Sequence, residues 1–255
     1  MAIHSRRSNL HTGSMLKQIK LPDLLSVCNA LFGFSAILFV LTDESEKAIK
    51  TALVFILVAA VIDGLDGLAA RTIESSLIGK YLDSLADLIS FGVAPAIVAF
   101  ALYKNVLCLA HTHVELISAF CGAYVVCGML RLARFDAKSS LQRDFEGLPI
   151  TGSAIFLASF LLLALELDLP GYPYVLIILM AVLCLLMTSG IRYIKLRDNL
   201  VVIAVGIGFS SLFLLYATSL QLFVYPTAVI VALSALYISS PVIRHLLNWI
   251  LHLHN

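Results

Sequence analysis

The stretch Leu53-Val-Phe-Ile-Leu-Val-Ala-Ala-Val-Ile-Asp63-Gly-Leu-Asp66 runs from ten apolar residues directly into two carboxylates. Residues 49–70 around it are long enough to cross a bilayer as one helix, which takes about 20 residues. Such runs recur: 60% of the 255 residues are hydrophobic and 13% are charged, against about 45–50% and 25% in soluble globular chains. The composition predicts an all-α integral membrane protein, since a helix in lipid satisfies its own backbone hydrogen bonds. It excludes a disordered chain, a nucleic-acid-binding protein and a small secreted fold stapled by disulfides.

Eight apolar segments of spanning length follow one another along the chain: 22–41, 49–70, 78–102, 114–134, 149–167, 172–190, 199–218 and 222–243. Lysine and arginine are distributed unevenly over the connections between them. With the N-terminus inside, fourteen of the 17 lie on the inner side, and only Lys47, Lys50 and Lys104 lie on the outer side. Because cytoplasmic loops carry the excess of positive charge, we expect a multi-pass protein of the cell membrane with both termini in the cytoplasm.

Four aspartates lie at the inner ends of the second and third segments: Asp63, Asp66, Asp83 and Asp87. An ionised carboxylate in or near hydrocarbon is costly unless it is paired or reaches water, and the basic residues nearby in sequence are only Arg71 and Lys80. Spacings of three and four residues place each pair of acids on one face of its helix. Two segments joined by a short connection are antiparallel neighbours, so we expect the pairs to face each other. Together they could hold two divalent cations, which prefer carboxylate oxygens.

Two cations near the cytoplasmic end of a helix pair can bind a pyrophosphate, neutralise charge on its phosphorus and activate an attacking hydroxyl. A cation-coupled transporter also uses intramembrane carboxylates, but it places them near the bilayer midplane, often on broken helices. The position of the four acids favours chemistry at the membrane interface, with a transporter as the alternative from another functional class.

The residues from Asp63 to Asp87 resemble the signature of the CDP-alcohol phosphatidyltransferase family. That signature reads D-x-x-D-G-x-x-A-R, a gap, then G-x-x-x-D-x-x-x-D, and its fixed positions are all present here around a gap of seven residues. Residues 82–96, 130–149 and 187–193 contain stretches similar to the phosphatidylserine and archaetidylserine synthase branch of the family. Two residues depart from that branch: Asp136 stands where it usually has Asn, and Thr151 where it often has Pro.

The resemblance implies a six-helix catalytic core and a role for each signature residue. The implied ligands of two divalent ions, Mg²⁺ or Mn²⁺, are Asp63, Asp66, Asp83 and Asp87. The implied contacts with the CDP-linked lipid are Gly67, Ala70, Arg71 and Gly79. Asp87 would also be the general base. The implied reaction is attack of the L-serine hydroxyl on the lipid-attached phosphorus of CDP-diacylglycerol or CDP-archaeol, which releases CMP.

Serine carries a carboxylate, and a guanidinium fork binds a carboxylate well in a low-dielectric site. Arg131 and Arg134 lie three residues apart and share a helical face, so they are the candidates for binding the serine carboxylate or the lipid phosphate. Another acceptor of the same family, glycerol 3-phosphate or an inositol phosphate, remains an alternative. The choice between an ester and an ether lipid also stays open.

We expect four parts along the chain. They are a basic cytoplasmic tail at 1–20, a catalytic membrane core at 21–197, additional transmembrane helices at 198–243 and a cytoplasmic tail at 244–255. The resemblance covers about residues 20–197, so the last two apolar segments carry no diagnostic motif. It further implies a homodimer surrounded by membrane lipids.

Overall fold

The computed structural model describes residues 19–43, 45–72, 78–107, 111–138, 145–193 and 224–253. Apart from two short strands, the elements in this part of the chain are helices. In chain order they are α1 (Leu21–Thr42), α2 (Glu46–Thr72), α3 (Gly79–Asp87), the π-helix η2 (Leu88–Val93), α4 (Ala94–Leu107), α5 (His111–Lys138), β1 (Phe145–Glu146), α6 (Ile150–Glu166), α7 (Tyr172–Thr188), β2 (Arg192–Tyr193) and α9 (Val224–Leu253).

The helices match the apolar segments of the sequence. Within the part of the chain that the structure describes, five stretches are long and apolar enough to cross a membrane: Pro22–Thr42, Glu46–Ala69, Gly79–Lys104, Val114–Ala137 and Val224–Arg244. The shorter apolar helices α6 and α7 have 17 residues each. The prediction of an all-α, multi-pass membrane protein is confirmed, while the expected segment 199–218 lies outside the described residues.

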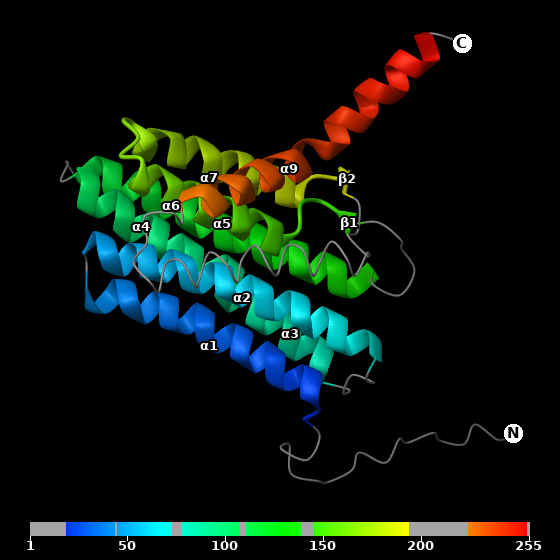
Figure 1. Cartoon of the computed structure of the whole chain (residues 1–255), viewed down its shortest axis with the longest axis horizontal. Coiled ribbons are helices and arrows are strands. Elements are labelled where there is room, and N and C mark those ends of the chain that lie inside the picture. Colours follow the sequence, from blue (N-terminus) through cyan, green and yellow to red (C-terminus); the bar gives the residue numbers. More distant parts are fainter. Residues whose placement is uncertain are drawn as a thin grey trace, which may run out of the picture.

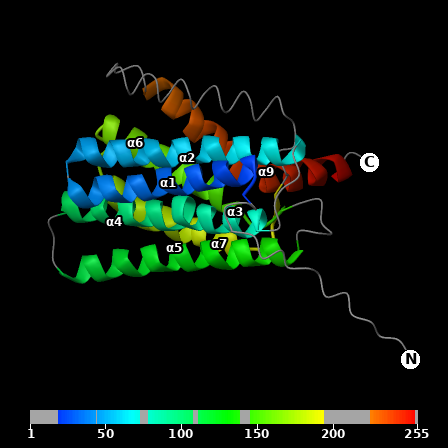
Figure 2. The ribbon, with the colours of Figure 1, turned by 90° about the horizontal axis from the view of Figure 1, so that it is seen from below.

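The helices lie side by side with their axes running along the long direction of the molecule (Figure 1). α1 packs along α2, α5 packs on α7, and α6 contacts both α2 and α9. The view turned by 90° shows the same arrangement from below (Figure 2). The buried core lies between these helices and includes Leu53 of α2, Phe91 of η2 and Leu161 of α6. The bundle therefore has two ends, and the site described below lies at the end where α1 begins.

The third apolar segment is one continuous helical stretch through α3, η2 and α4, with the π-helix placed directly after Asp87. At this π-helix α1 comes very close. A Cβ on Gly33 of α1 would lie 2.5 Å from the Cα of Ser90, so only glycine permits this approach. The Ser90 hydroxyl donates a hydrogen bond of 2.8 Å to the carbonyl of Asn29. Short π-helical turns are frequent at functional sites.

The connection before α6 is tied to the chain that leaves α7. β1 and β2 pair in antiparallel register, Phe145 with Tyr193 and Glu146 with Arg192. Gly147 follows with a φ of 81° and donates its N–H to the carbonyl of Ile191 at 2.8 Å. A side chain there would be strained in conformation and would also meet the Met187 carbonyl. The β1–β2 pair and the Gly147 hydrogen bond together fix the start of α6 at the same end of the bundle as α3.

The last helix differs from the others in its course. α9 packs on α6 and then continues past Arg244, so that its C-terminal part projects beyond the bundle (Figure 1). Residues 246–251 are helical as a continuation of α9, with Pro241 inside the helix.

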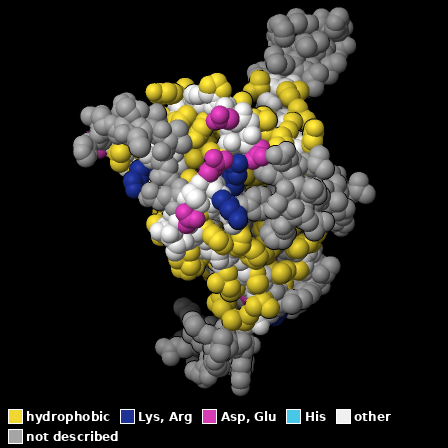
Figure 3. All heavy atoms as spheres, turned by 60° about the vertical axis from the view of Figure 1, so that its left-hand side comes forward, with side chains coloured by type: hydrophobic (Ala, Val, Ile, Leu, Met, Phe, Trp, Pro, Cys, Tyr) yellow, Lys and Arg dark blue, Asp and Glu magenta, His cyan; other side chains and the backbone are white. Residues whose placement is uncertain are grey.

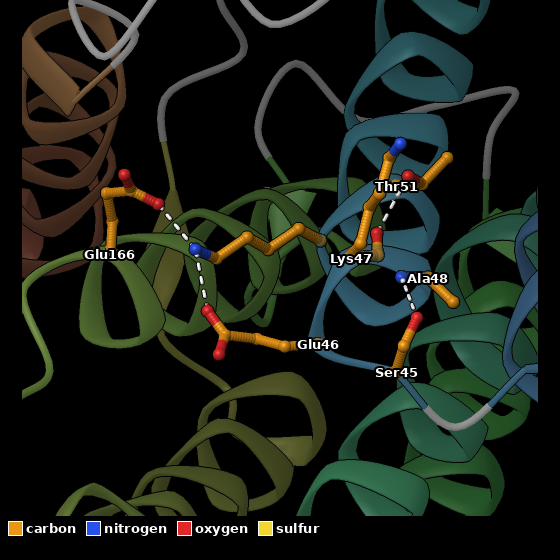
Figure 4. A network of polar contacts seen from close by, with 7 residues as sticks. Ser45, Glu46, Lys47, Ala48, Thr51 and Glu166 are labelled. Atoms are coloured by element: carbon orange, nitrogen blue, oxygen red, sulfur yellow. Dashed lines mark hydrogen bonds and ion pairs between the residues drawn. The ribbon is translucent and has the colours of Figure 1, made fainter. Parts of the chain in front are cut away.

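The opposite end of the bundle carries its own cluster of charges. Figure 3, which brings the left end of Figure 1 forward, shows carboxylates and amines gathered among hydrophobic side chains. At that end the Lys50 ammonium pairs with Glu46 at 2.7 Å and with Glu166, the last residue of α6, at 2.6 Å. Figure 4 shows the two glutamates converging on one amine from different helices. The side chains of Lys50 and Glu166 are each only 18% exposed. This ion pair therefore links α2 to α6 at a position from which water is partly excluded.

We expect Lys50→Met to lower the melting temperature of the purified protein. The substitution leaves the half-buried Glu166 carboxylate without its ammonium, a cost of about 1–3 kcal/mol for a site between the surface and the interior. Lys47→Met removes an exposed amine from the same helix and is the matched control. Equal melting temperatures for the two variants in a thermal-shift assay would contradict the stabilising role of the Lys50–Glu166 ion pair.

Candidate active site

Three aspartates from two helices converge near the N-terminal end of α1. Asp63 of α2 and Asp83 and Asp87 of α3 each offer a carboxylate oxygen, and these oxygens lie within 4.8 Å of one another. Asp87 is buried, while the other two are partly buried. These three carboxylates converge as the spacing in the sequence predicts. Three carboxylates this close repel one another unless a cation or protons lie between them, and carboxylate oxygens are typical ligands of Mg²⁺, Mn²⁺ and Ca²⁺.

Asp66, the fourth predicted ligand, lies on α2 one turn further on and outside this group of three. It is buried, and its Oδ2 accepts a hydrogen bond from the Ser26 hydroxyl of α1. Its Oδ1 has no hydrogen-bond partner among the described residues. A buried oxygen of this kind calls for a partner from outside the protein. The donor set and this open oxygen both fit a divalent cation.

α1 lines the site with a polar face. From the sequence alone Asn29 stands out as a polar residue within this apolar segment, whereas Asp23 and Ser26 were not recognised. Besides Ser26, Asn29 is fully buried and its Nδ2 donates to Asp87 Oδ1 at 3.3 Å. Asp23 is also buried and accepts from the Lys20 backbone N–H at 2.7 Å, where α1 begins. The signal was present in the sequence, because Asp23, Ser26 and Asn29 recur every three residues in an otherwise apolar segment.

Arg131 of α5 is the basic residue beside the carboxylates. It is only 6% exposed, and its guanidinium interacts electrostatically with Asp87 and Asp63. Its Cζ lies 5.3 Å from the centroid of the Phe135 ring, one turn further along α5, a cation–π distance. Among the side chains that the structure describes, one buried guanidinium stands against three carboxylates, an excess of negative charge that favours a bound cation.

Arg134, the other predicted acceptor residue, has a different set of contacts. Its guanidinium donates to the carbonyl of Ser189 at 2.9 Å and to that of Thr188 at 3.0 Å. These carbonyls lie at the C-terminal end of α7, where backbone acceptors have no partner within the helix and a positive charge is favourable. The structure thus separates the two arginines: Arg131 lies beside the aspartates, and Arg134 binds the end of α7.

Both residues that depart from the branch pattern lie at this site. Asp136 of α5 accepts from the Ser84 hydroxyl at 2.9 Å, and its backbone carbonyl accepts from Lys80 Nζ at 2.8 Å. It also adds negative charge near Asp83. The Thr151 side chain at the start of α6 lies within hydrogen-bonding reach of Asp63. They therefore alter the surroundings of the acids while leaving the acids in place.

The residues expected to approach a nucleotide lie around the ends of α2 and α3. Gly67 is exposed, and a Cβ there would meet nothing within 4 Å, so the space beside it is open. Gly79 is buried and begins α3. Ala70 and Arg71 belong to the last turns of α2, while their side chains lie outside what the structure describes.

A family model matches this part of the chain. Residues 19–188, which include every aspartate described above, match the model for CDP-alcohol phosphatidyltransferase. The chain belongs to the CDP-alcohol phosphatidyltransferase family. This family uses a divalent metal, so the converging carboxylates lie where such a member needs them.

Relatives of this phosphatidyltransferase include enzymes with curated names. The archaetidylserine synthase of Methanothermobacter thermautotrophicus is 36% identical over 179 residues, which cover 69% of this chain and 70% of that protein. The CDP-diacylglycerol–serine O-phosphatidyltransferase of Saccharomyces cerevisiae is 38% identical over 157 residues, 56% of this chain and 54% of the yeast protein. The protein of that name from Methanocaldococcus jannaschii is 35% identical over 189 residues, 73% of this chain and 80% of that protein. The chain thus spans about half of the yeast relative and more of the two archaeal ones.

Proposed function

We propose that this chain transfers a phosphatidyl or archaetidyl group from a CDP-linked lipid to L-serine and releases CMP. The observation that carries the proposal is the convergence of Asp63, Asp83 and Asp87 beside a buried arginine in a family member whose relatives are named for serine transfer. The donor would be CDP-diacylglycerol or CDP-archaeol. Two divalent cations, Mg²⁺ or Mn²⁺, would be held by the three converging aspartates together with Asp66.

The reaction needs a base for the serine hydroxyl. Asp87 is the candidate because it is buried among the acids and its Oδ1 already accepts from Asn29, which fixes the direction of its carboxylate. In the proposed step the serine oxygen bonds to the lipid-attached phosphorus as its proton passes to Asp87. The bond from that phosphorus to the bridging oxygen breaks, and CMP leaves with the bridging oxygen. What divalent cations supply in such a site is neutralisation of charge on the pyrophosphate, which makes CMP a better leaving group.

The remaining site residues receive roles by position. Open space beside Gly67 would admit the cytidine nucleotide close to the backbone, with Ala70, Arg71 and Gly79 as further contacts. Arg131 would bind the serine carboxylate, because a buried guanidinium presents paired donors to a carboxylate. Arg134 is the weaker candidate for that role, since its donors are engaged at the end of α7.

The proposed reaction also bears on the orientation of the protein in the membrane. A water-soluble acceptor and CMP require the acids to face the cytoplasm, which agrees with the distribution of lysine and arginine in the sequence. We therefore propose a plasma-membrane enzyme with both termini and the active site on the cytoplasmic side. The homodimer implied by the family stays a prediction, which cross-linking in membranes would test.

An acceptor panel tests the proposal. Purified protein supplied with CDP-diacylglycerol or CDP-archaeol and Mn²⁺ is expected to release CMP with L-serine at a rate at least about tenfold above that with glycerol 3-phosphate or inositol phosphate. The reason is that the described site contains one buried arginine near the acids, whereas a phosphate-bearing acceptor calls for a denser basic pocket. CMP is measured by chromatography. Release with glycerol 3-phosphate and none with serine would overturn the acceptor and leave the family assignment intact.

A further inference from the structure

α1 supplies hydrogen-bond donors to two of the four signature aspartates. The Ser26 hydroxyl donates to Asp66 Oδ2. Three residues further along, Asn29 Nδ2 donates to Asp87 Oδ1 at 3.3 Å. Ser26 and Asn29 are both buried, and their spacing places them on one face of α1. This face therefore holds acids that come from two other helices, α2 and α3.

The two carboxylate oxygens of Asp66 have different surroundings. Oδ2 accepts from Ser26, whereas Oδ1 is buried and has no hydrogen-bond partner within the described part of the chain. Asp66 as a whole is only 6% exposed. A buried oxygen without a partner is costly, so Oδ1 calls for a ligand from outside the protein, and a divalent cation fits it. Because a serine hydroxyl has a single hydrogen to donate, Ser26 occupies one oxygen and leaves the other open.

The donor to Asp66 is a neutral group, which preserves the attraction of the carboxylate for a cation. A lysine or arginine at this position would pair with the carboxylate and cancel the charge that attracts a metal ion. A hydroxyl stabilises the ionised carboxylate through a charge-assisted hydrogen bond and leaves its negative charge in place. Residues that hydrogen-bond to a metal ligand in this way orient the ligand and raise the affinity for the metal.

The direction of the Ser26 hydroxyl is fixed by the packing of α1 on η2. The Ser90 hydroxyl of η2 donates to the backbone carbonyl of Asn29 at 2.8 Å. One turn further on, a Cβ on Gly33 would lie 2.5 Å from the Cα of Ser90, so the two backbones approach each other closely there. These contacts oppose rotation of α1 about its axis. Since Ser26 lies about one turn before Asn29, its hydroxyl stays directed at Asp66.

We propose that Ser26 is a positioning residue for the metal centre, which holds Asp66 by Oδ2 so that Oδ1 remains available to a divalent cation. This inference rests on the proposed function and deepens it, because it makes α1 a part of the metal-binding machinery. Without the hydroxyl, the Asp66 carboxylate can rotate about its Cβ–Cγ bond, and a cation must order it on binding, at a cost in affinity. The proposed base, Asp87, keeps its own donor, Asn29.

Binding of Mn²⁺ to Ser26→Ala tests this inference without any substrate. The melting temperature of the purified protein is followed as Mn²⁺ is added, and each variant is compared with itself in the absence of metal. We expect the Mn²⁺ concentration at half of the full shift to rise about 10- to 100-fold, the range for losing a residue that supports a metal ligand. In the CMP-release assay the Mn²⁺ requirement should rise likewise, while kcat at saturating Mn²⁺ and KM for L-serine stay within about twofold.

Ser35→Ala is the matched control. Ser35 lies on the same helix, and its hydroxyl donates to the Leu31 carbonyl of that helix at 2.8 Å. The substitution removes the same group from α1 at a distance from the acids, so the Mn²⁺ titration of this variant should equal that of the wild type.

A second pair of variants decides the question if Ser26→Ala fails to fold. Ser26→Thr and Ser26→Val introduce side chains of nearly the same shape, and only threonine retains the hydroxyl. The threonine variant should bind Mn²⁺ at least about tenfold more tightly than the valine variant. Equal Mn²⁺ titrations for the members of this pair, or for folded Ser26→Ala and the wild type, would overturn the positioning role, as would a wild type whose melting temperature does not respond to Mn²⁺. If the wild type binds Mn²⁺ but releases no CMP with serine, the proposed function fails, while the metal titrations still decide the role of Ser26.

Discussion

Asp87→Asn is expected to abolish CMP release, with kcat falling by at least about a thousandfold. General-base catalysis alone contributes about 10²- to 10⁴-fold, and Asp87 is also one of the three converging carboxylates. The amide has nearly the same shape as the carboxyl group, so the packing around this buried residue is retained. An amide is a far weaker base and a weaker ligand for a divalent cation than a carboxylate, and both losses act on the same step.

The measurement is CMP release at saturating CDP-lipid, serine and Mn²⁺, together with a melting curve to verify folding. Asp43→Asn is the matched control. Asp43 is exposed after the C-terminal end of α1, where it accepts hydrogen bonds from Ser45, far along the helix from Asp23. The activity of the Asp43→Asn variant should equal that of the wild type. An Asp87→Asn protein that retains a tenth of the wild-type kcat would refute the role of Asp87 as base.

Removing divalent cations is expected to destabilise the wild-type protein and to abolish its activity, and both effects should reverse when Mn²⁺ is restored. A ligand that binds only the folded state adds about 2.7 kcal/mol of stability at a concentration one hundred times its dissociation constant. In the absence of metal the oxygens of Asp63, Asp83 and Asp87, within 4.8 Å of one another, repel each other.

Asp83→Asn separates the repulsion from the metal binding. This variant should melt at a higher temperature than the wild type when both are free of metal, because one of three like charges is gone. It should also lose most of the stabilisation by Mn²⁺, and these thermal shifts need no activity assay. Asp168→Asn, at an exposed position with a φ of 47° that asparagine tolerates, is the control. If Asp83→Asn melts at a lower temperature than the wild type when both are free of metal, repulsion among the three carboxylates does not destabilise the protein, and the prediction is wrong.

The sequence sufficed to predict where the described helices run and that Asp63, Asp83 and Asp87 meet, whereas Asp66 lies outside that group. The i, i+4 spacing of Asp83 and Asp87 fixes their shared face. The short connection after α2 brings the next helical stretch back beside it, where η2 and α4 contact α2 and α3 packs on α1. The short strands and the π-helix were not foreseen, because they depend on contacts between distant segments. Gly33 permits such a contact by letting α1 approach Ser90 closely.

The partners of individual polar side chains were harder to predict. Ser26 bonds to Asp66 and Asn29 to Asp87 because α1 turns one particular face towards α2 and α3, which helical periodicity alone does not specify. Arg131 and Arg134 share a helical face, yet their guanidinium groups diverge, since a long flexible side chain can end far from its backbone position.

The π-helix after Asp87 has a geometric consequence for the acids. Hydrogen bonds in a π-helix span five residues where those in an α-helix span four, so η2 holds one more residue than an α-helical turn would. One residue corresponds to about 100° of rotation about a helix axis. The π-helix therefore changes the direction in which Asp83 and Asp87 point relative to the face of α4 that packs in the bundle. Inserting or deleting one residue in η2 would rotate both carboxylates away from Asp63 without changing either aspartate.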